Sequence, residues 1–377
     1  MDDAGSGDVA SRLAADFVRF ADAESGPIPM YERLVRAAAV DLDVLSILYA
    51  APPGQRRPVL LLAALHDLLL DEPTLPLARW YPSITGHEPP VEDPWPAARA
   101  LLLDRRDHLE QVVATRTIQT NEANRSAIWF AAMRAACADV ADTPVALLEL
   151  GASAGLNLRW DRYRLSVDGH PVRGHLDSKV ELFCSIRRGH PPIDGPMSPI
   201  VARIGIDRDP IRVDDEDSMR WLRACVWPEQ MVRLSRFDAA VSELRDDPPA
   251  LIRGDAVDEL ADAIDALPND SHLVVFHSWF LTYLARDRRA AIDEQLALAA
   301  RDRPVTRLTY EGAGVTPGFD DAVVPGADPA EYRSILGMSR WRNAAAGAPA
   351  KRMDRLLGAC HAHGDWLDWL DWLDRLD

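Results

Sequence analysis

The sequence predicts an α/β protein in which an all-helical N-terminal domain, residues 1–142, precedes a mostly parallel, helix-covered sheet, residues 143–377. The first observation is that apolar residues in the N-terminal part recur at three- and four-residue steps, as at Leu13 and Phe17, which is typical of helices. The second is that short apolar runs alternate with helical stretches from Val145 onward, which favours a parallel sheet. The third is length, because 377 residues can enclose two separate cores.

The N-terminal domain is expected to contain helices only, since no apolar run typical of a strand precedes Thr143. The helical pattern is interrupted at Pro52-Pro53-Gly54 and again in the Pro-rich stretch 88–96. Elsewhere in this domain the apolar spacing predicts helices over about 60–70, 97–114 and 124–140. Such a domain would roof a pocket in the following domain and select its substrate.

The second domain is expected to hold five buried parallel strands, Val145–Leu150, Val201–Ile206, Ala250–Arg253, His272–Phe276 and Val305–Tyr310. The long segment between the first two contains Asp168-Gly169, which predicts a hairpin insertion near residues 163–184. Two later apolar runs, Ile335–Trp341 and Met353–Cys360, are predicted to close the sheet as a pair of edge strands.

The C-terminal segment, residues 365–377, repeats Trp-Leu-Asp three times. In a helix, Trp366, Trp369 and Trp372 would form one slowly winding ridge, so the repeat predicts an amphipathic helix. Such a helix would dock on the surface of its own chain. The alternative is that it mediates a contact with a partner or, in a homodimer, with a second copy of the chain.

The charge and cysteine content restrict the partners and the compartment. The chain has 59 acidic and 42 basic residues, a net charge of −17, and this field makes nucleic acid an unlikely partner. Four widely spaced cysteines without a C-x-x-C pair indicate free thiols in a reducing compartment. Residues 1–9 lack the apolar core of a signal peptide, and no apolar stretch reaches the ~18 residues of a membrane span. A cytoplasmic protein without membrane association is expected.

The segment Val145–Leu158 is the most informative part of the chain. It is an apolar run ending in Glu149, followed by a turn of small residues and the expected start of a helix, an arrangement that can direct backbone N–H groups at a ligand. One interpretation is a serine hydrolase, because residues 151–155 satisfy the G-x-S-x-G pattern, with Ser153 as nucleophile and Asp255 and His277 following in the required order. That fold, however, expects several strands and an oxyanion loop upstream, where this sequence is helical.

The second interpretation is a nucleotide site. Three successive strand ends carry acids, namely Glu149, Asp207 and Asp255. In a doubly wound sheet, ligands bind beyond the carboxyl ends of the strands, where the strand order reverses. The carboxylate of Asp207 would accept from both ribose hydroxyls, and Asp255 with the N–H of Ala256 would bond an adenine edge.

These residues carry a family resemblance. The segments Glu149-Leu150-Gly151, Gly205 to Pro210 and Gly254-Asp255-Ala256 resemble motifs I, II and III of class I S-adenosylmethionine (SAM) dependent methyltransferases, over about residues 143–310. The resemblance implies a Rossmann-like fold and SAM as cofactor. It would place the amino-acid end of SAM against Glu149, Gly151, Ala152, Ser153 and Gly155, the ribose at Asp207, and the adenine at Asp255 and Ala256.

The whole chain also resembles an uncharacterised bacterial family of unknown function, which implies a shared fold without an activity. The segments that carry this resemblance are Gln119–Glu122, Glu149–Leu158, Trp221–Trp227, His277-Ser278-Trp279 and Cys360–Gly364.

Two further groups are candidates for the chemistry. His277 follows the fourth strand, where methyltransferases place substrate-facing groups, and it could take a proton from the attacking atom. The alternative is a structural, hydrogen-bonded histidine. For the polar run 119–125 there are two interpretations. In one, Thr120 or Asn121 caps a helix. In the other, the side chains of the run contact the pocket. We take as candidate substrate contacts Asn121, Glu122, Arg125 and Ser278.

A metal site is not predicted. His361 and His363, beside Cys360, would share one face of a strand, but no compact set of further ligands accompanies them.

The leading functional hypothesis is SAM-dependent methyl transfer to a small molecule or a protein side chain. The competing hypothesis is a non-catalytic protein that binds SAM or a nucleotide, or that keeps only the scaffold. It is favoured by Ser153, which stands where motif I usually has glycine, and by the lack of a recognisable acceptor motif. The third hypothesis is a serine hydrolase with Ser153 as nucleophile.

Overall fold

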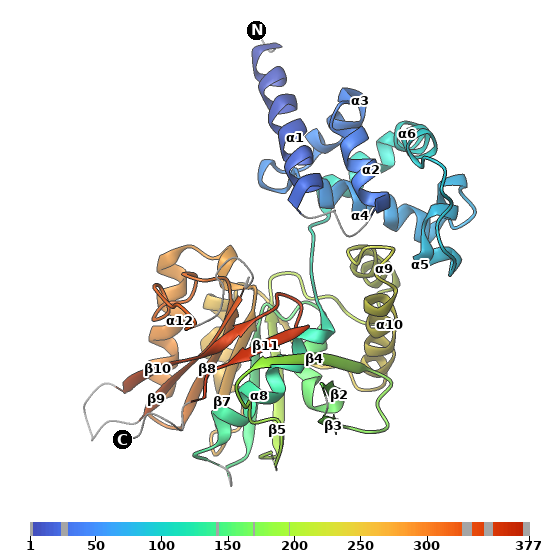
Figure 1. Ribbon diagram of the computed structural model, residues 1–377. Helices are drawn as coiled ribbons and strands as arrows, with labels where there is room; N and C mark the ends of the chain where they lie inside the picture. Colours follow the sequence, from blue (N-terminus) through green and yellow to red (C-terminus); the bar gives the residue numbers. More distant parts are fainter. Residues whose placement is uncertain are drawn as a thin grey trace. The chain divides into compact units, whose positions relative to one another are not determined.

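The computed structural model describes residues 3–23, 29–140, 143–168, 170–195, 197–325, 334–342 and 350–371. Its contacts divide the chain into two compact units (Figure 1). The first contains residues up to Thr120 together with Asp214–Ser235, and the second contains Asn121–Val213 together with the chain from Arg236 onward. This division differs from the boundary expected after residue 142.

The first unit is built from helices in the residues that the structure describes, as the sequence predicts. They are α1 (Asp3–Ala23), α2 (Pro29–Ala38), α3 (Leu42–Leu45), α4 (Pro58–Asp71), α5 (Pro82–Thr85), α6 (Trp95–Asp104), α7 (Arg106–Thr115) and α9 (Glu216–Ala224). Pro58 occupies the first turn of α4, where the missing N–H costs nothing. Leu60 to Leu65 and Leu68 of α4 are buried, so this helix is the centre of the unit's core.

Helix α9 joins the first unit through polar contacts with α4. Arg220 donates to the Asp67 carboxylate at 3.1 Å, and the His66 ring bonds the carbonyl of Ala224 at 3.1 Å. Burial is the main cause that lowers the pKa of His66 to about 3. These contacts join segments about 150 residues apart, which the local pattern does not reveal.

The second unit is an α/β structure around a mixed, mostly parallel sheet. Five parallel strands form its centre, at the positions expected from the sequence: β1 (Val145–Leu150), β5 (Ile200–Asp207), β6 (Ala250–Arg253), β7 (His272–Ser278) and β8 (Val305–Glu311). From β1 the chain passes to β5 and β6 on one side, and then to β7 and β8 on the other. The strand order therefore reverses between β1 and β7. The helices of this unit are α8 (Ser126–Cys137), α11 (Ala256–Asp265), α12 (Arg286–Ala299) and most of α10 (Met231–Asp246).

Helix α8 belongs to the sheet because its aromatic side chains pack on the strands. The Trp129 ring lies 5.2 Å from that of Phe276 and 5.8 Å from that of Tyr310, both in edge-on geometry. This packing explains why the unit begins at Asn121 rather than near residue 142.

The remaining strands are β2 (Arg164–Val167), β3 (His170–Gly174), β4 (Glu181–Arg188), β9 (Ser334–Arg342), β10 (Lys351–Cys360) and β11 (Trp366–Trp369). The antiparallel pairing of β2 with β3 confirms the hairpin insertion, whose turn residue Gly169 lies outside the described residues. The antiparallel pair of β9 and β10 is also confirmed, but its expected place at the sheet edge is wrong. The complete order is β3-β2-β4-β11-β10-β9-β8-β7-β1-β5-β6, so the inserted strands extend the sheet beyond β10.

The predicted C-terminal helix over 365–377 is wrong where the structure describes it. Trp366–Trp369 forms β11, which pairs antiparallel with β10 and parallel with β4. Two neighbours satisfy the backbone on both sides, and Trp fits a pleated surface well, so the tertiary pairing overrides the helical pattern. The ridge that would have carried a dimer contact is absent over these residues, and Trp372 lies outside the described part.

All four cysteines are free thiols, as expected, and Cys137, Cys184 and Cys360 are buried. In the part of the chain that the structure describes, no helix has the length and hydrophobicity to cross a bilayer.

Candidate functional site

The strand ends predicted to form the site lie side by side at the carboxyl edge of the sheet. In the registers of the parallel pairs, Leu150 of β1 is opposite Ile206 of β5 on one side and His277 of β7 on the other. Asp207 of β5 is opposite Arg253 of β6, two residues before Asp255. The fold therefore brings together residues that are more than 100 positions apart in the sequence.

The turn after β1 is fixed to the neighbouring strand. The N–H groups of Gly151 and Ala152 both donate to the carbonyl of Ile206, at 2.9 and 3.1 Å. Gly151 has φ +73°, and a Cβ on it would lie 2.7 Å from Cδ2 of Phe280. Glycine is required here for two reasons, the left-handed backbone and the ring packed against it. Gly155 also has a positive φ, +80°, and would place a Cβ 2.6 Å from Pro249.

Asp207 closes the same turn. One carboxylate oxygen accepts from the N–H of Ser153 at 2.8 Å, and the other accepts from the N–H of Asp209 at 2.9 Å. The residue predicted to bind ribose therefore already holds the backbone of two loops.

Asp255 is engaged in a similar way. It caps α11 by accepting from the N–H of Val257 at 3.0 Å, and it forms ion pairs with Arg208, at 3.0 Å, and with Arg288. Burial opposes ionisation, but the Val257 hydrogen bond and the two arginines outweigh it and lower the pKa of Asp255. Ala256 is the first, buried residue of α11.

Glu149 differs from the other two acids because its carboxyl group has an unsatisfied oxygen. The residue is 2% exposed, and its Oε2 has no hydrogen-bond partner. Burial first, and then the charge of Asp207, raise the pKa of Glu149 well above its usual value, although the charge of Arg125 opposes the shift. Asn121 lies at the same turn, where its Nδ2 donates to the carbonyl of Ala152 at 2.7 Å. The buried Oδ1 of Asn121 also has no donor.

The other residues of the polar run divide between local structure and the strand ends. Glu122 caps the short helix η4 (Ala123–Arg125) by accepting from the N–H of Asn124 at 3.0 Å, and it pairs with Arg236 at 3.5 Å. Arg125 reaches the strand ends, where it donates to the hydroxyl of Ser278 at 3.4 Å and to the carbonyl of Ala362 at 3.0 Å. Arg125 and Ser278 thus lie together, whereas the helix cap is Glu122 rather than Thr120 or Asn121.

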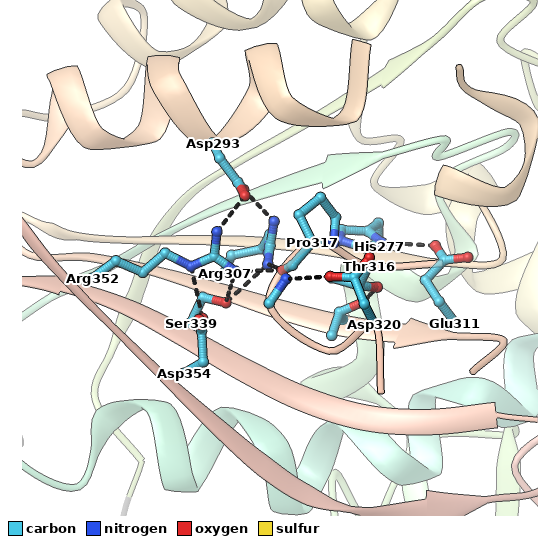
Figure 2. Close-up of polar contacts among 12 residues, drawn as sticks. His277, Asp293, Arg307, Glu311, Thr316, Pro317, Asp320, Ser339, Arg352 and Asp354 are labelled. Carbon is cyan, nitrogen blue, oxygen red and sulfur yellow. Dashed lines mark hydrogen bonds and ion pairs between the residues drawn. The ribbon is translucent and has the colours of Figure 1, made fainter. Parts of the chain in front are cut away.

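His277 is completely buried, and its Nδ1 lies 2.8 Å from Oε1 of Glu311 at the end of β8 (Figure 2). Alternation along β7 places its side chain on the face of Leu273 and Val275, whose core includes residues of α12. Leu150 of β1 shares that face, so the neighbouring Glu149 points to the other one. In this conformation His277 is a buried, hydrogen-bonded side chain, which corresponds to the structural alternative. Its acid partner is Glu311, and the structure does not bring Asp255 to it.

Glu311 is a residue that the sequence reasoning missed. The strand Val305–Glu311 ends in an acid followed by Gly312, which is the pattern that singled out Glu149 before Gly151. The same signal could therefore have identified Glu311.

The turn His361–Asp365 is a second group that only the structure brings to this edge. The hydroxyl of Tyr310 donates to the carbonyl of His361, and Nδ2 of Asn124 donates to that of His363 at 3.2 Å. A Cβ on Gly364 would lie 2.2 Å from the carbonyl oxygen of Asn124, so the turn packs directly on the polar run. Among the described residues, no group of three or more His, Cys, Asp or Glu side chains is arranged to hold a metal ion.

Backbone strain is also concentrated here. Ser153 and Trp279 are the non-glycine residues with positive φ in the described part of the chain, both at 52°. They follow β1 and β7, the two strands between which the order reverses. Such conformations cost energy and tend to occur at functional sites, which makes this edge the strongest candidate.

Comparison with known proteins gives the family but no activity. No curated protein matches the chain. The model of a family described as "uncharacterized protein conserved in bacteria (DUF2332)" matches residues 14–369. Because this match spans nearly the whole sequence, the chain belongs to this uncharacterised bacterial family.

Proposed function

We propose that the chain binds SAM at the carboxyl edge of its sheet and transfers the methyl group to a small molecule or a protein side chain. The observation that carries this proposal is the pair of buried acceptors, Oε2 of Glu149 and Oδ1 of Asn121, that lack a hydrogen-bond donor. A buried acceptor without a donor is costly, so a ligand that donates here would be strongly favoured. The ammonium group at the amino-acid end of SAM is such a donor, and its positive charge would favour the ionised form of Glu149.

The topology supports the same location. Ligands of open α/β sheets bind where the strand order reverses, which here is between the carboxyl ends of β1 and β7. The turn with Gly151, Ser153 and Gly155 follows β1 at that point.

Some of the residues expected to contact SAM fit this role better than others. Each oxygen of Asp207 accepts one backbone N–H and retains a further lone pair for a ribose hydroxyl. Asp255 is held by Val257, Arg208 and Arg288, so we leave it out of the cofactor contacts. The proposal therefore assigns the ammonium group to Glu149 and Asn121, and the ribose to Asp207.

Bound SAM supplies a methyl group activated by a sulfonium. The chain's own part is to hold that group and the acceptor in line, and such positioning accounts for much of the rate in transfer reactions. Arg125 and Ser278, joined at 3.4 Å, lie beside the strand ends, and we assign to them the contact with the acceptor.

The test is calorimetric titration of the full chain with S-adenosylhomocysteine, which lacks the methyl group and cannot react. Micromolar affinity, about −8 kcal/mol, is expected for the wild type. Glu149→Gln keeps the shape but removes the charge, and should weaken binding about tenfold or more. The matched control is Glu181→Gln on β4, whose side chain is 56% exposed, and it should bind like the wild type. Absence of wild-type binding at millimolar ligand, or equal losses in both variants, would refute the proposal.

A second candidate, a protein that binds SAM without catalysis, is favoured by the complete burial of His277. It predicts the same calorimetric result without turnover. Incubation with SAM and a panel of protic acceptors separates the two, because only an enzyme forms S-adenosylhomocysteine in amounts that depend on the acceptor.

A further inference from the structure

The turn His361–Asp365 lies at the same edge of the sheet as the proposed cofactor site. Strand β10 is antiparallel to β9, and β9 is antiparallel to β8, so β10 runs in the same direction as β8. The residues that follow Cys360, the last of β10, therefore emerge at the carboxyl edge beside the end of β8. The hydroxyl of Tyr310, near the end of β8, donates to the carbonyl of His361 and anchors the turn there.

Arg125 connects this turn with the strand ends. Its Nε donates to the carbonyl of Ala362 at 3.0 Å, and its Nη1 donates to the hydroxyl of Ser278 at 3.4 Å. Its charge also acts on Glu149. One buried guanidinium thus touches the turn after β10 and the end of β7, and it interacts electrostatically with the acid at the end of β1.

His361 is a partly exposed histidine with a carboxylate partner. Its Nδ1 lies 2.9 Å from Oδ2 of Asp365, close enough for an ion pair but without the geometry of a hydrogen bond, and the side chain is 33% exposed. Asp365 is itself held, because Nδ2 of Asn124 donates to its Oδ1 at 3.2 Å. The negative charge of a carboxylate beside Nδ1 favours the tautomer that carries its proton there and leaves Nε2 as a proton acceptor.

Resting on the proposed function, we propose that His361, oriented by Asp365, is the general base of the site and that the methyl acceptor is a protic nucleophile, an alcohol, a phenol or an amine. The nucleophile forms a bond to the methyl carbon, the carbon–sulfur bond breaks with its electron pair going to sulfur, and the proton of the nucleophile passes to Nε2 of His361. The products are the methylated acceptor, S-adenosylhomocysteine and a protonated imidazole, which Asp365 stabilises. His277, fully buried, cannot serve in this way in the observed conformation.

Further aromatic, charged and titratable groups lie around His361. The ring of His363 lies 5.6 Å from that of His361, and the ring of Trp366 lies 6.2 Å away with the Arg187 guanidinium stacked over it. Tyr310 and Arg125 contact the backbone of the turn. Asp365 is the carboxylate paired with the imidazole, so its removal should affect the base more than any other single change.

The test is chemical modification of histidines with diethyl pyrocarbonate, followed by mass spectrometry, with and without saturating S-adenosylhomocysteine. The matched control is His190, another histidine paired with an aspartate, since its Nδ1 lies 3.0 Å from Asp371 and its side chain is 94% exposed. We expect the ligand to slow modification of His361 several-fold and to leave His190 unchanged. Equal reactivity of His361 in both states, with binding of the ligand shown by calorimetry, overturns this proposal and leaves the proposed function standing. Absence of binding refutes the proposed function itself.

A second, kinetic experiment measures methyl transfer to the panel of protic acceptors used to test the proposed function. His361→Gln should retain the affinity for S-adenosylhomocysteine and lower kcat by about 100-fold or more, the usual contribution of a general base. Asp365→Asn should lower kcat less and shift the pH profile, because the histidine remains but loses its orienting charge. An unchanged kcat in His361→Gln would also overturn the assignment.

Discussion

Glu311 binds His277 and the loop that follows it through a single carboxylate oxygen. This Oε1 lies 2.8 Å from Nδ1 of His277 (Figure 2), and it also accepts from the N–H groups of Phe280 at 2.8 Å and Leu281 at 3.0 Å. Both side chains are fully buried. The end of β8 therefore determines the path of the chain after β7, which includes the strained Trp279.

The first prediction concerns this contact. Glu311→Ala leaves three donors, two of them buried, without an acceptor and should lower the free energy of unfolding by roughly 3 kcal/mol or more. Glu311→Gln keeps a carbonyl oxygen at the same place and should cost clearly less. Denaturant unfolding of the two variants and the wild type measures both. Equal losses would mean that the oxygen is not what holds the loop.

The second prediction concerns the packing of Phe280 on the turn after β1. Gly151→Ala should destabilise the chain by roughly 1–3 kcal/mol, because φ is +73° and the added Cβ would meet the Phe280 ring at 2.7 Å. In a Phe280→Ala background the contact with the ring disappears and only the contact with Cβ, at 3.0 Å, remains, so the same substitution should cost less. A double-mutant cycle measures the difference. Additive losses would show that the Phe280 ring is not what requires the glycine.

The third prediction concerns the pH dependence that Glu149 confers. Since its folded-state pKa is raised, mainly by burial, the native state holds the proton more tightly than the unfolded state. Its contribution to stability is complete below about pH 4.5 and is lost as pH rises toward the folded pKa, at up to about 1.4 kcal/mol per pH unit. Glu149→Gln should therefore become more stable relative to the wild type as pH increases from 4 to 8. Parallel stability curves for the two proteins would contradict the shift, and the exposed Glu181→Gln is the control.

The fourth prediction concerns acid sensitivity of the first unit. The pKa of His66 is lowered to about 3, chiefly by burial. The unfolded state therefore binds a proton near pH 6.5, whereas the native state binds it only near pH 3. Stability should fall as pH decreases from about 6.5 to 3, by up to about 1.4 kcal/mol per unit.

His66→Gln should flatten this slope, whatever its cost at neutral pH from lost contacts with Ala224 and Ser83. Equilibrium unfolding between pH 7 and 4 provides the measurement, and the exposed His175→Gln should retain the wild-type slope. A steep slope in both variants would assign the acid sensitivity to other groups.

Much of the central sheet could be predicted from local patterns. The runs at Val145–Leu150, Ala250–Arg253 and Val305–Tyr310 are apolar, short and bounded by helical stretches, and each forms a strand within one residue of the expected limits. Such strands are buried on both faces, so their composition alone identifies them. The chain's membership of an uncharacterised bacterial family was likewise evident from its motifs.

The candidate site could be predicted only in part. The acids Glu149, Asp207 and Asp255 were found because polar residues at strand ends stand out against apolar runs. Which of these carboxylates already has partners was not predictable, since the groups that engage Asp207 and Asp255, such as Ser153 and Arg288, come from other loops and helices. Glu149 alone of the three keeps an unsatisfied oxygen, and that distinction depends on packing.

By itself, then, the sequence determined which segments are strands or helices, because hydrophobic periodicity is a local property of the chain. Only the tertiary structure decided how they are combined. It made Trp366–Trp369 a strand instead of a helix, directed His277 toward Glu311, and brought His361 to the edge where Glu149 lies. Each of these outcomes depends on backbone pairing or packing between residues far apart in the chain, and no local pattern records the energy of such contacts.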